Sequence, residues 1–309
     1  MKYSVGNLII FFISLIFLLL TSCKKDDVSL RQADEKLLIE NYLLTHNKQI
    51  TPTASGLYFE SIADGTGDSS PMLDDFVVIN FTETSIDGKL LDTSNKALAD
   101  SNNIISSSLV DGPLKLSIKG IRIKGLIEGL LQMKEGGHAW MLMPSSLTFN
   151  DYVPRIFDVE LLKIVPDPVA YEKEKIKNYL DTLSRRIAAN APVTPADSTP
   201  EGIYYIETKA GTGNSPMEGD NVNATFTFKL IDGQLIGKSV NYSFRIGDIN
   251  VIQGLSIGVK KMKKGGKAIL VIPFSKGFGT EGVTQQDVIK IPMYATLVYE
   301  IELNSIGGL

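Results

Sequence analysis

The chain has few of the residues on which metal and thiol chemistry depend. Its 309 residues include one cysteine and two histidines, His46 and His138. A Cys/His metal cluster or a Cys/His nucleophilic pair needs more of these side chains, which excludes both. We therefore expect no metal and no cofactor. For His138, beside a Gly-Gly pair, we expect a solvated turn position.

An excess of basic charge is also missing. The chain carries 31 Lys and Arg against 35 Asp and Glu, a net charge of −4 and a pI near 5.4. Such a balance provides no basic surface for nucleic acid, so nucleic acid is excluded as a partner. The chain is 43% hydrophobic and 21% charged, which is ordinary for globular proteins. Its length is sufficient for two domains.

One long apolar run, Leu8 to Leu20, follows Lys2, and this pattern is typical of a secretory signal over residues 1–22. The run ends in Leu20-Thr21-Ser22-Cys23, which resembles a bacterial lipobox. In a lipobox the cysteine becomes the lipidated first residue of the mature protein; a plain signal anchor is the alternative. The resemblance implies a protein of the cell envelope, lipid-anchored through Cys23 to a bacterial membrane, the outer membrane.

Charged residues dominate the segment after the cysteine, so we expect residues 23–35 to be a flexible tether. Its Lys24-Lys25-Asp26-Asp27 run resembles the signal that sends some Bacteroidetes lipoproteins to the outer face of the outer membrane. A tether that is merely solvated explains the run equally well. Periplasmic and surface orientations of the anchor therefore both remain open.

The rest of the chain contains a repeat. The stretch from 251 to 279 has a weaker copy from 122 to 150, aligned by Gly254 with Gly125 and by the Gly-Gly pairs at 265 and 136. In each copy apolar residues share one face of a helix of about two turns, which needs a sheet to pack on. A Gly-Gly turn and an alternating strand follow. The residues of the two apolar faces are Leu255, Val259 and Met262, and Leu126, Leu130 and Met133.

The repeat extends upstream of this unit. Helical patterns at 36–46 and 171–190 precede strands whose hairpin turns are Asp87-Gly88 and Asp232-Gly233. The first copy carries about 16 extra residues between hairpin and helix, including a Ser/Asn-rich run to Ser108 that we expect to be a surface loop. Two prolines, at 166 and 168, mark a boundary between domains at 36–166 and 167–309.

Both copies resemble FKBP-type peptidyl-prolyl cis-trans isomerase domains. The second, about Gly202 to Leu303, carries Gly-Thr-Gly, the Asp-Gly hairpin, Val-Ile-x-Gly, Phe-Gly and Ile-Pro-x-x-Ala-Thr-Leu-Val-Tyr; the first spans about Gly56 to Leu162. The resemblance implies an α+β fold of two tandem domains. Each is an antiparallel half-barrel sheet wrapped around one short helix and preceded by an N-terminal helix, with an apolar pocket between sheet and helix.

The resemblance also implies pocket residues, and each copy departs from the family at a different point. The aspartate of the family's pocket falls at Gly237 in the second copy but is kept as Asp92 in the first, where a turn-capping role is the alternative. The first copy has Arg122 in place of an apolar residue and lacks most of the loop that overhangs the pocket. The implied residues are Phe226, Ile236, Phe244, Val251, Ile252, Leu255, Phe278 and Tyr299 in the second copy, and Phe81, Leu91, Asp92, Ile123, Leu126, Phe149 and Phe157 in the first.

The function implied is that of an FKBP-type prolyl isomerase that assists the folding of exported proteins by acting on their proline-containing segments, weakly and mainly through the second domain. Prolyl isomerisation has a barrier of about 20 kcal/mol set by amide resonance, and it requires no proton transfer or nucleophile. The alternative is a lipoprotein that binds peptides or acts as a scaffold without useful turnover. The oligomeric state is not predicted by the sequence.

Overall fold

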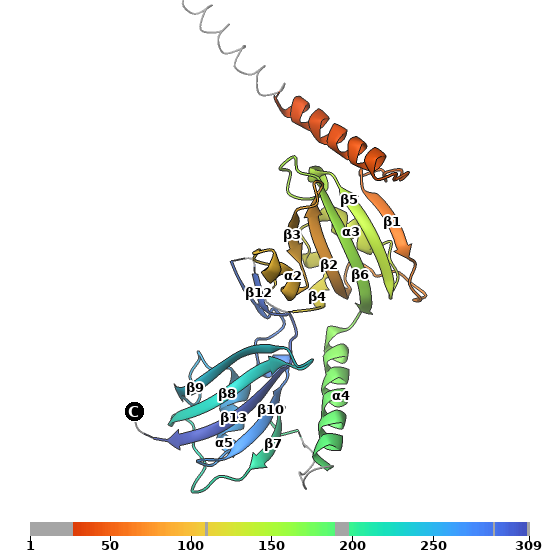
Figure 1. The fold of residues 1–309 in the computed structure, drawn as a ribbon. Helices are drawn as coiled ribbons and strands as arrows, with labels where there is room; N and C mark the ends of the chain where they lie inside the picture. Colours follow the sequence, from red (N-terminus) through yellow and green to blue (C-terminus); the bar gives the residue numbers. More distant parts are fainter. Residues whose placement is uncertain (1–26, 109–110, 189–197, 287, 308–309) are drawn as a thin grey trace, which may run out of the picture.

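The computed structural model describes residues 27–108, 111–188, 198–286 and 288–307 (Figure 1). The predicted signal peptide, Cys23 and the start of the tether lie outside the described residues. Within these ranges, no helix has both the length and the apolar character that crossing a membrane requires.

The first domain is built on one antiparallel sheet (Figure 1). Its strand order is β1-β5-β6-β2-β3, and β4 pairs with β2 beyond the end of β3. The turn between β2 and β3 is the predicted Asp87-Gly88, with Gly88 at a φ of 85°. The elements are β1 (Tyr58–Ala63), β2 (Phe76–Ser85), β3 (Leu90–Thr93), α2 (Lys96–Ser101), β4 (Leu114–Ser117), α3 (Lys124–Leu130), β5 (Gly137–Met143) and β6 (Arg155–Val165), with short 3₁₀ turns at Ile118–Gly120 and Ser145–Leu147.

The second domain repeats this plan. Its sheet has the order β7-β10-β13-β8-β9, and a separate two-stranded hairpin, β11-β12, has no counterpart among the described residues of the first domain. The elements are α4 (Pro168–Ala188), β7 (Tyr204–Lys209), β8 (Asn221–Leu230), β9 (Leu235–Arg245), α5 (Gln253–Lys261), β10 (Lys267–Ile272), β11 (Val283–Gln285), β12 (Val288–Ile291) and β13 (Leu297–Ile306), with a 3₁₀ turn at Phe274–Lys276. The predicted α+β fold with antiparallel sheets and few helices is confirmed.

Each sheet carries its short helix on the face that forms the core. Glycines let α3 and α5 lie very close to the strand beneath: a Cβ at Gly129 would meet Met141 Sδ at 2.3 Å, and one at Gly258 would meet Leu270 Cδ1 at 2.4 Å. Met133 and Met262 are buried in this core, as predicted. The repeated glycines therefore belong to the helix-on-sheet packing, which any larger side chain would push apart.

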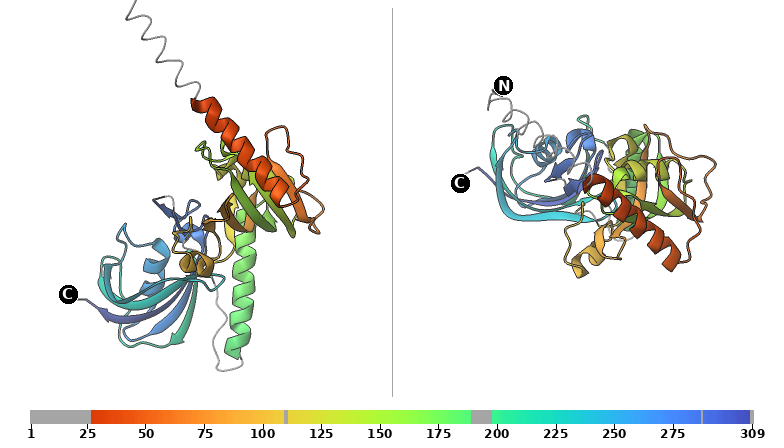
Figure 2. Two further views of the ribbon diagram at one scale, coloured as in Figure 1. Left: turned by 45° about the horizontal axis from the view of Figure 1, so that its top comes forward. Right: turned by 90° about the horizontal axis from the view of Figure 1, so that it is seen from above.

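A longer helix covers the opposite face of each sheet (Figure 2). In the first domain, Ile39 of the N-terminal helix, residues 27–45, packs with Trp140 of β5. In the second, Ile176 of α4 packs with Val271 of β10 and Val298 of β13. The predicted leading helix of each copy is thus present, and each sheet is covered on both faces.

Two segments differ from their predicted structure. Residues 27–35, expected to belong to the tether, form the first turns of the N-terminal helix, because Glu35 is buried and accepts hydrogen bonds from the backbone N–H and the hydroxyl of Ser145. The Ser/Asn-rich run of the first copy, expected to be a surface loop, begins with the last two residues of α2 and is largely exposed, but it buries Ser106 and Ser108. Local polarity did not predict the helix in the first segment or the buried serines in the second, because both involve contacts with distant residues.

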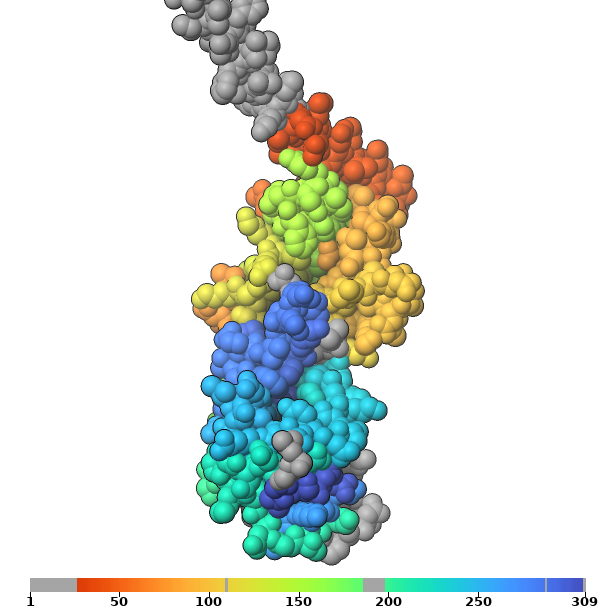
Figure 3. Space-filling model, turned by 90° about the vertical axis from the view of Figure 1, so that its left-hand side faces the viewer, coloured from red at the N-terminus to blue at the C-terminus, as the bar shows by residue number. Residues whose placement is uncertain are grey.

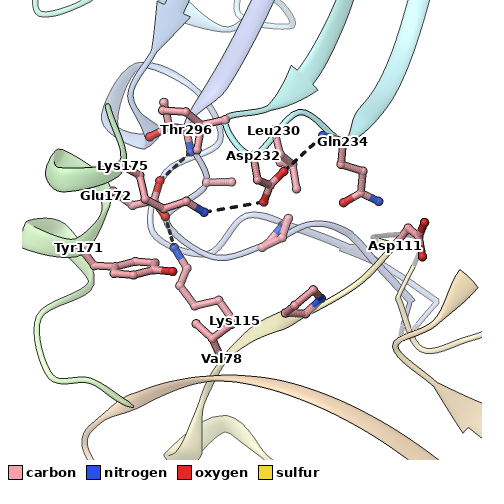
Figure 4. Close-up of a pocket in the computed structure, with 14 residues that line it drawn as sticks. Val78, Asp111, Lys115, Tyr171, Glu172, Lys175, Leu230, Asp232, Gln234 and Thr296 are labelled. Atoms are coloured by element: carbon pink, nitrogen blue, oxygen red, sulfur yellow. Dashed lines mark hydrogen bonds and ion pairs between the residues drawn. The ribbon is translucent and has the colours of Figure 1, made fainter. Parts of the chain in front are cut away.

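A buried ion pair joins the two domains beside a cavity of about 380 Å³ (Figure 4). Lys115 of β4 contacts Glu172 of α4, and both side chains are almost fully buried. The other carboxylate oxygen of Glu172 accepts a hydrogen bond from the backbone N–H of Thr296 at 3.3 Å. Burial lowers the pKa of Lys115, although the charge of Glu172 opposes this. One strand of the first domain, the linking helix and a loop of the second domain therefore meet at a single carboxylate.

Candidate functional site

The eight residues predicted for the second domain lie together on the face of its sheet that carries α5. Phe226 on β8, Phe244 on β9, Leu255 on α5 and Tyr299 on β13 are buried members of one core cluster. The half-buried residues packed against the cluster are Ile236, Val251, Ile252 and Phe278. Because the same cluster also extends through the core of the first domain, closer contacts have to define the site within it.

An aromatic cluster forms the centre of this site. Tyr299 lies between two rings: Phe226, with centroids 5.4 Å apart, and Phe228, with centroids 5.1 Å apart and planes only 11° apart. Tyr242 of β9 meets the edge of Phe226 at 5.7 Å. Burial raises the pKa of the Tyr299 hydroxyl above its ordinary value. The cluster is a stacked apolar surface with no charged group among these rings.

Phe228 occupies the space next to Gly237. The two residues are cross-strand partners on β8 and β9, and a Cβ built on Gly237 would lie 2.7 Å from Cε1 of the Phe228 ring. No aspartate could be placed at 237 unless this ring moved. The Phe228 ring thus fills the space next to the position where the resemblance implied a carboxylate.

A hollow of about 600 Å³ lies beside α5 and the turn before it, and none of the clustered rings lines it. Val251, Ile252 and Phe278 contribute to its lining, together with polar groups such as Asp248 and Lys260. Ile249, in the turn between β9 and α5, is 96% exposed at this hollow. The site therefore offers an accessible apolar rim next to its buried rings.

Residues 213–304 match the family model described as FKBP-type peptidyl-prolyl cis-trans isomerase. The second domain is similar to this family. The matched range includes all eight residues predicted for the second FKBP-like site and none of those predicted for the first.

Individual relatives agree with the family model. The chain is 36% identical over 116 residues to "FK506-binding protein 4" of Dictyostelium discoideum, a match over 37% of this chain and 31% of the relative. It is 38% identical over 106 residues to "FKBP-type peptidyl-prolyl cis-trans isomerase FkpA" of Escherichia coli, over 33% of this chain and 37% of the relative. The crystal structure of Escherichia coli FkpA is 30% identical, with a TM-score of 0.34, over 44% of this chain and 64% of that one. The chain thus spans less than two thirds of the length of these relatives.

The corresponding site of the first domain is only partly assembled. Phe81, Leu126 and Phe157 are buried in its core, with the rings of Phe81 and Phe157 6.3 Å apart, and Ile123 packs against them. Leu91 is half-buried on β3 and is not part of a described core cluster. Phe149 is 54% exposed, and the guanidinium of Arg155 lies 4.6 Å above its ring. The side chains predicted to form the rim therefore do not converge as they do in the second domain.

A buried ion pair fills the first site where Phe228 fills the second. Glu83 of β2 is at the position equivalent to Phe228, with Asp92 as its cross-strand partner on β3. Its Oε1 lies 2.9 Å from Nε of Arg155, and both side chains are almost fully buried. Burial raises the pKa of Glu83 to about 7, because desolvation outweighs the charge of Arg155 and the nearby Asp92 adds to the rise. A charged pair in this position does not suit a prolyl ring.

Asp92 binds the Ser/Asn-rich run that ends at Ser108, which is the insertion of the first domain relative to the second. Its Oδ1 accepts hydrogen bonds from the Ser106 hydroxyl at 2.9 Å, from the Ser107 N–H at 3.0 Å and from the Thr93 N–H at 2.7 Å. The carboxylate therefore organises residues 106–107, a use that neither the pocket role nor the turn-capping role anticipated.

The sequence analysis missed Glu83, Arg155 and Phe228. The offset of 145 that pairs Gly88 with Gly233 also pairs Glu83 with Phe228. Strand alternation places each two residues beyond a predicted pocket phenylalanine, on the same face. These two signals together identify the position, but the interaction with Arg155 is visible only in the structure.

Proposed function

We propose that the second domain binds proline-containing segments of exported polypeptides and catalyses their cis-trans isomerisation weakly. The observation that carries this proposal is the aromatic cluster of Phe226, Phe228 and Tyr299, walled by Leu255 and Phe278, inside the range that matches the isomerase family. The first domain contributes no turnover in this proposal, since Glu83 and Arg155 occupy its site.

The chemistry needs only an environment that suits a twisted amide. Rotation about the X–Pro bond costs amide resonance, and the twisted state has less charge separation than the planar amide. An apolar, water-poor surface therefore disfavours the twisted amide less than it disfavours the planar ground state. Of these rings Phe226 and Tyr299 are buried, whereas Phe228 is half-buried, as is Phe278, and these two can pack against the prolyl ring. The ring of Phe228 takes up part of the site, and for this reason we expect low turnover.

A second candidate function is peptide binding without useful turnover, and Phe228 favours it. A ring that stacks on Tyr299 at 5.1 Å leaves less room for a rotating amide while keeping an apolar surface for contact. Both functions use the same site. They differ in whether bound proline isomerises faster.

A protease-coupled assay on an Ala-Pro tetrapeptide separates the two functions. We would use the chain from residue 24 and compare it with Phe278→Ala and with the control Met217→Ala, which removes an exposed apolar side chain of the same domain. The proposal predicts measurable acceleration that is lost in Phe278→Ala and retained in Met217→Ala. Absence of acceleration, with the peptide still binding, would favour the second candidate.

We also propose that the protein is exported and anchored at the outer membrane through a lipid on Cys23. The apolar run that ends at this cysteine supports the proposal. Cys23→Ala should release the protein from the membrane fraction. Equal membrane association of both forms would argue for a signal anchor.

A further inference from the structure

The first domain holds the hairpin of the second domain that connects two predicted site residues. The β11-β12 hairpin lies between Phe278 and Tyr299 in the sequence, and Val283 and Ile291 pack into the core of the second domain. The backbone N–H of Ile289 donates a hydrogen bond to the carbonyl of Ser107 at 2.8 Å. Ser108 and Ile289 form a parallel bridge. The insertion of the first domain thus pairs with the outer edge of β12, next to which α2 lies in Figure 1.

A second contact reaches the same connection. Tyr294 follows β12, and its ring meets the edge of Phe76 of β2 at 5.4 Å and that of Phe274 at 5.0 Å. Tyr294 has a φ of 54°, which is uncommon for a bulky residue and which neighbouring contacts have to maintain. Figure 3 shows this blue segment of the second domain lying against the yellow surface of the first. The hairpin is therefore held at its edge and at its base.

The insertion is itself anchored by Asp92. The Ser106 hydroxyl faces two acceptors with its one proton, Oδ1 of Asp92 at 2.9 Å and the carbonyl of Thr93 at 2.6 Å, and it accepts from the Ser108 N–H at 3.3 Å. Ser106 and Ser108 are 7% and 3% exposed, so these bonds are shielded from water. Loss of the Asp92 carboxylate would leave the Ser107 N–H without its acceptor. The Ser107 carbonyl, which accepts the hydrogen bond from Ile289, would then be held less firmly.

We propose that Asp92 is a positioning residue for the second domain: through residues 106–108 it holds the β11-β12 hairpin beside the proline-binding site. The inference rests on the proposed function of that site. The site of the first domain is closed by Glu83 and Arg155, and its described residues include no such hairpin. Within this arrangement the first domain acts on the site of its neighbour. A hairpin of two short strands has little stability by itself, so an added edge contact limits its opening.

Hydrogen exchange in the chain from residue 24 tests the inference independently of activity. Asp92→Ala and Ser106→Ala should each raise the exchange rate of the Ile289 amide about three- to tenfold, the effect of weakening one hydrogen bond. Asp64→Ala is the matched control, since Asp64 is an exposed aspartate of the same domain whose partner is Ser61. The amides of β2 report whether the first domain remains folded, and Ser106→Ala is the milder change if Asp92→Ala unfolds it.

The positioning role predicts in addition a higher KM for the Ala-Pro tetrapeptide in both variants, with little change in kcat. Unchanged exchange at Ile289 in both variants, with residues 106–108 exchanging faster, would overturn the inference. If both variants raise the exchange rate at Ile289 but the protein neither binds nor isomerises prolyl peptides, the proposed function is wrong, while the role of Asp92 in holding the hairpin stands. Activity without an exchange effect at Ile289 gives the reverse result.

Discussion

The contact between Phe228 and Gly237 predicts that Gly237→Ala destabilises the native protein but stabilises the Phe228→Ala variant. In the native chain, a methyl group at 237 would lie 2.7 and 3.1 Å from two carbons of the Phe228 ring. Overpacking of this kind costs about 1–3 kcal/mol, against which Ala regains about 0.5–1 kcal/mol of unfolded-state entropy relative to Gly. We therefore expect Gly237→Ala to destabilise the second domain.

Removal of the ring reverses this balance. Phe228 is half-buried, so Phe228→Ala should cost about 1.5–3 kcal/mol, less than a fully buried phenylalanine. In that background nothing crowds position 237, and Gly237→Ala should stabilise the domain by about 0.5 kcal/mol. The two changes should thus be coupled by about 1–3 kcal/mol, whereas independent sites add within about 0.5 kcal/mol.

Native-state hydrogen exchange of the β13 amides measures these free energies in the second domain. This probe is needed because the single tryptophan, Trp140, lies in the first domain. Met217→Ala serves as the control, since it removes an exposed side chain of the same domain. An equal cost of Gly237→Ala with and without the Phe228 ring would refute the argument that the ring fills the space next to position 237.

Three further predictions concern stability. Folding raises the pKa of Glu83 from its ordinary 4.5 to about 7, so its contribution to stability is complete below pH 4.5 and is lost as the pH rises through 7, by an amount on the order of 3 kcal/mol. Glu83→Gln should remove this dependence of stability on pH in urea unfolding followed by Trp140 fluorescence, and an unchanged dependence would contradict the prediction. Lys115→Ala should lower the free energy of unfolding by about 3–5 kcal/mol, because it leaves Glu172 buried without its partner, while Lys115→Met with Glu172→Leu should be nearly neutral. As the control, Lys96→Ala breaks an exposed pair and should cost less than about 0.5 kcal/mol in the same urea unfolding experiment. Gly258→Ala should destabilise the second domain by about 1–3 kcal/mol in calorimetry, because its Cβ would lie 2.4 Å from the buried Leu270, and a neutral result would mean that α5 can move away from the sheet.

Local features of the sequence were sufficient for the repeat and for several of its elements, whereas the fold class came from the family resemblance, and α2 and the β11-β12 hairpin were not predicted. Periodicity predicted α3 and α5, and the Asp-Gly pairs predicted the hairpin turns at Gly88 and Gly233. These features depend on neighbours a few residues apart, which are visible in the sequence. The family resemblance also implied eight site residues in the second domain, four of which are buried in the core and four of which are packed against it.

Tertiary structure alone decided what fills each site and what the insertion does. Glu83 and Phe228 occupy equivalent strand positions, yet one pairs with Arg155 of β6 and the other stacks on Tyr299 of β13. The run from 100 to 108 is polar and mostly exposed, but its end is buried where it pairs with a hairpin that lies about 180 residues later in the chain. Composition reports how polar a segment is. Whether that segment is buried depends on which distant segment pairs with it, and only the folded chain brings the two together.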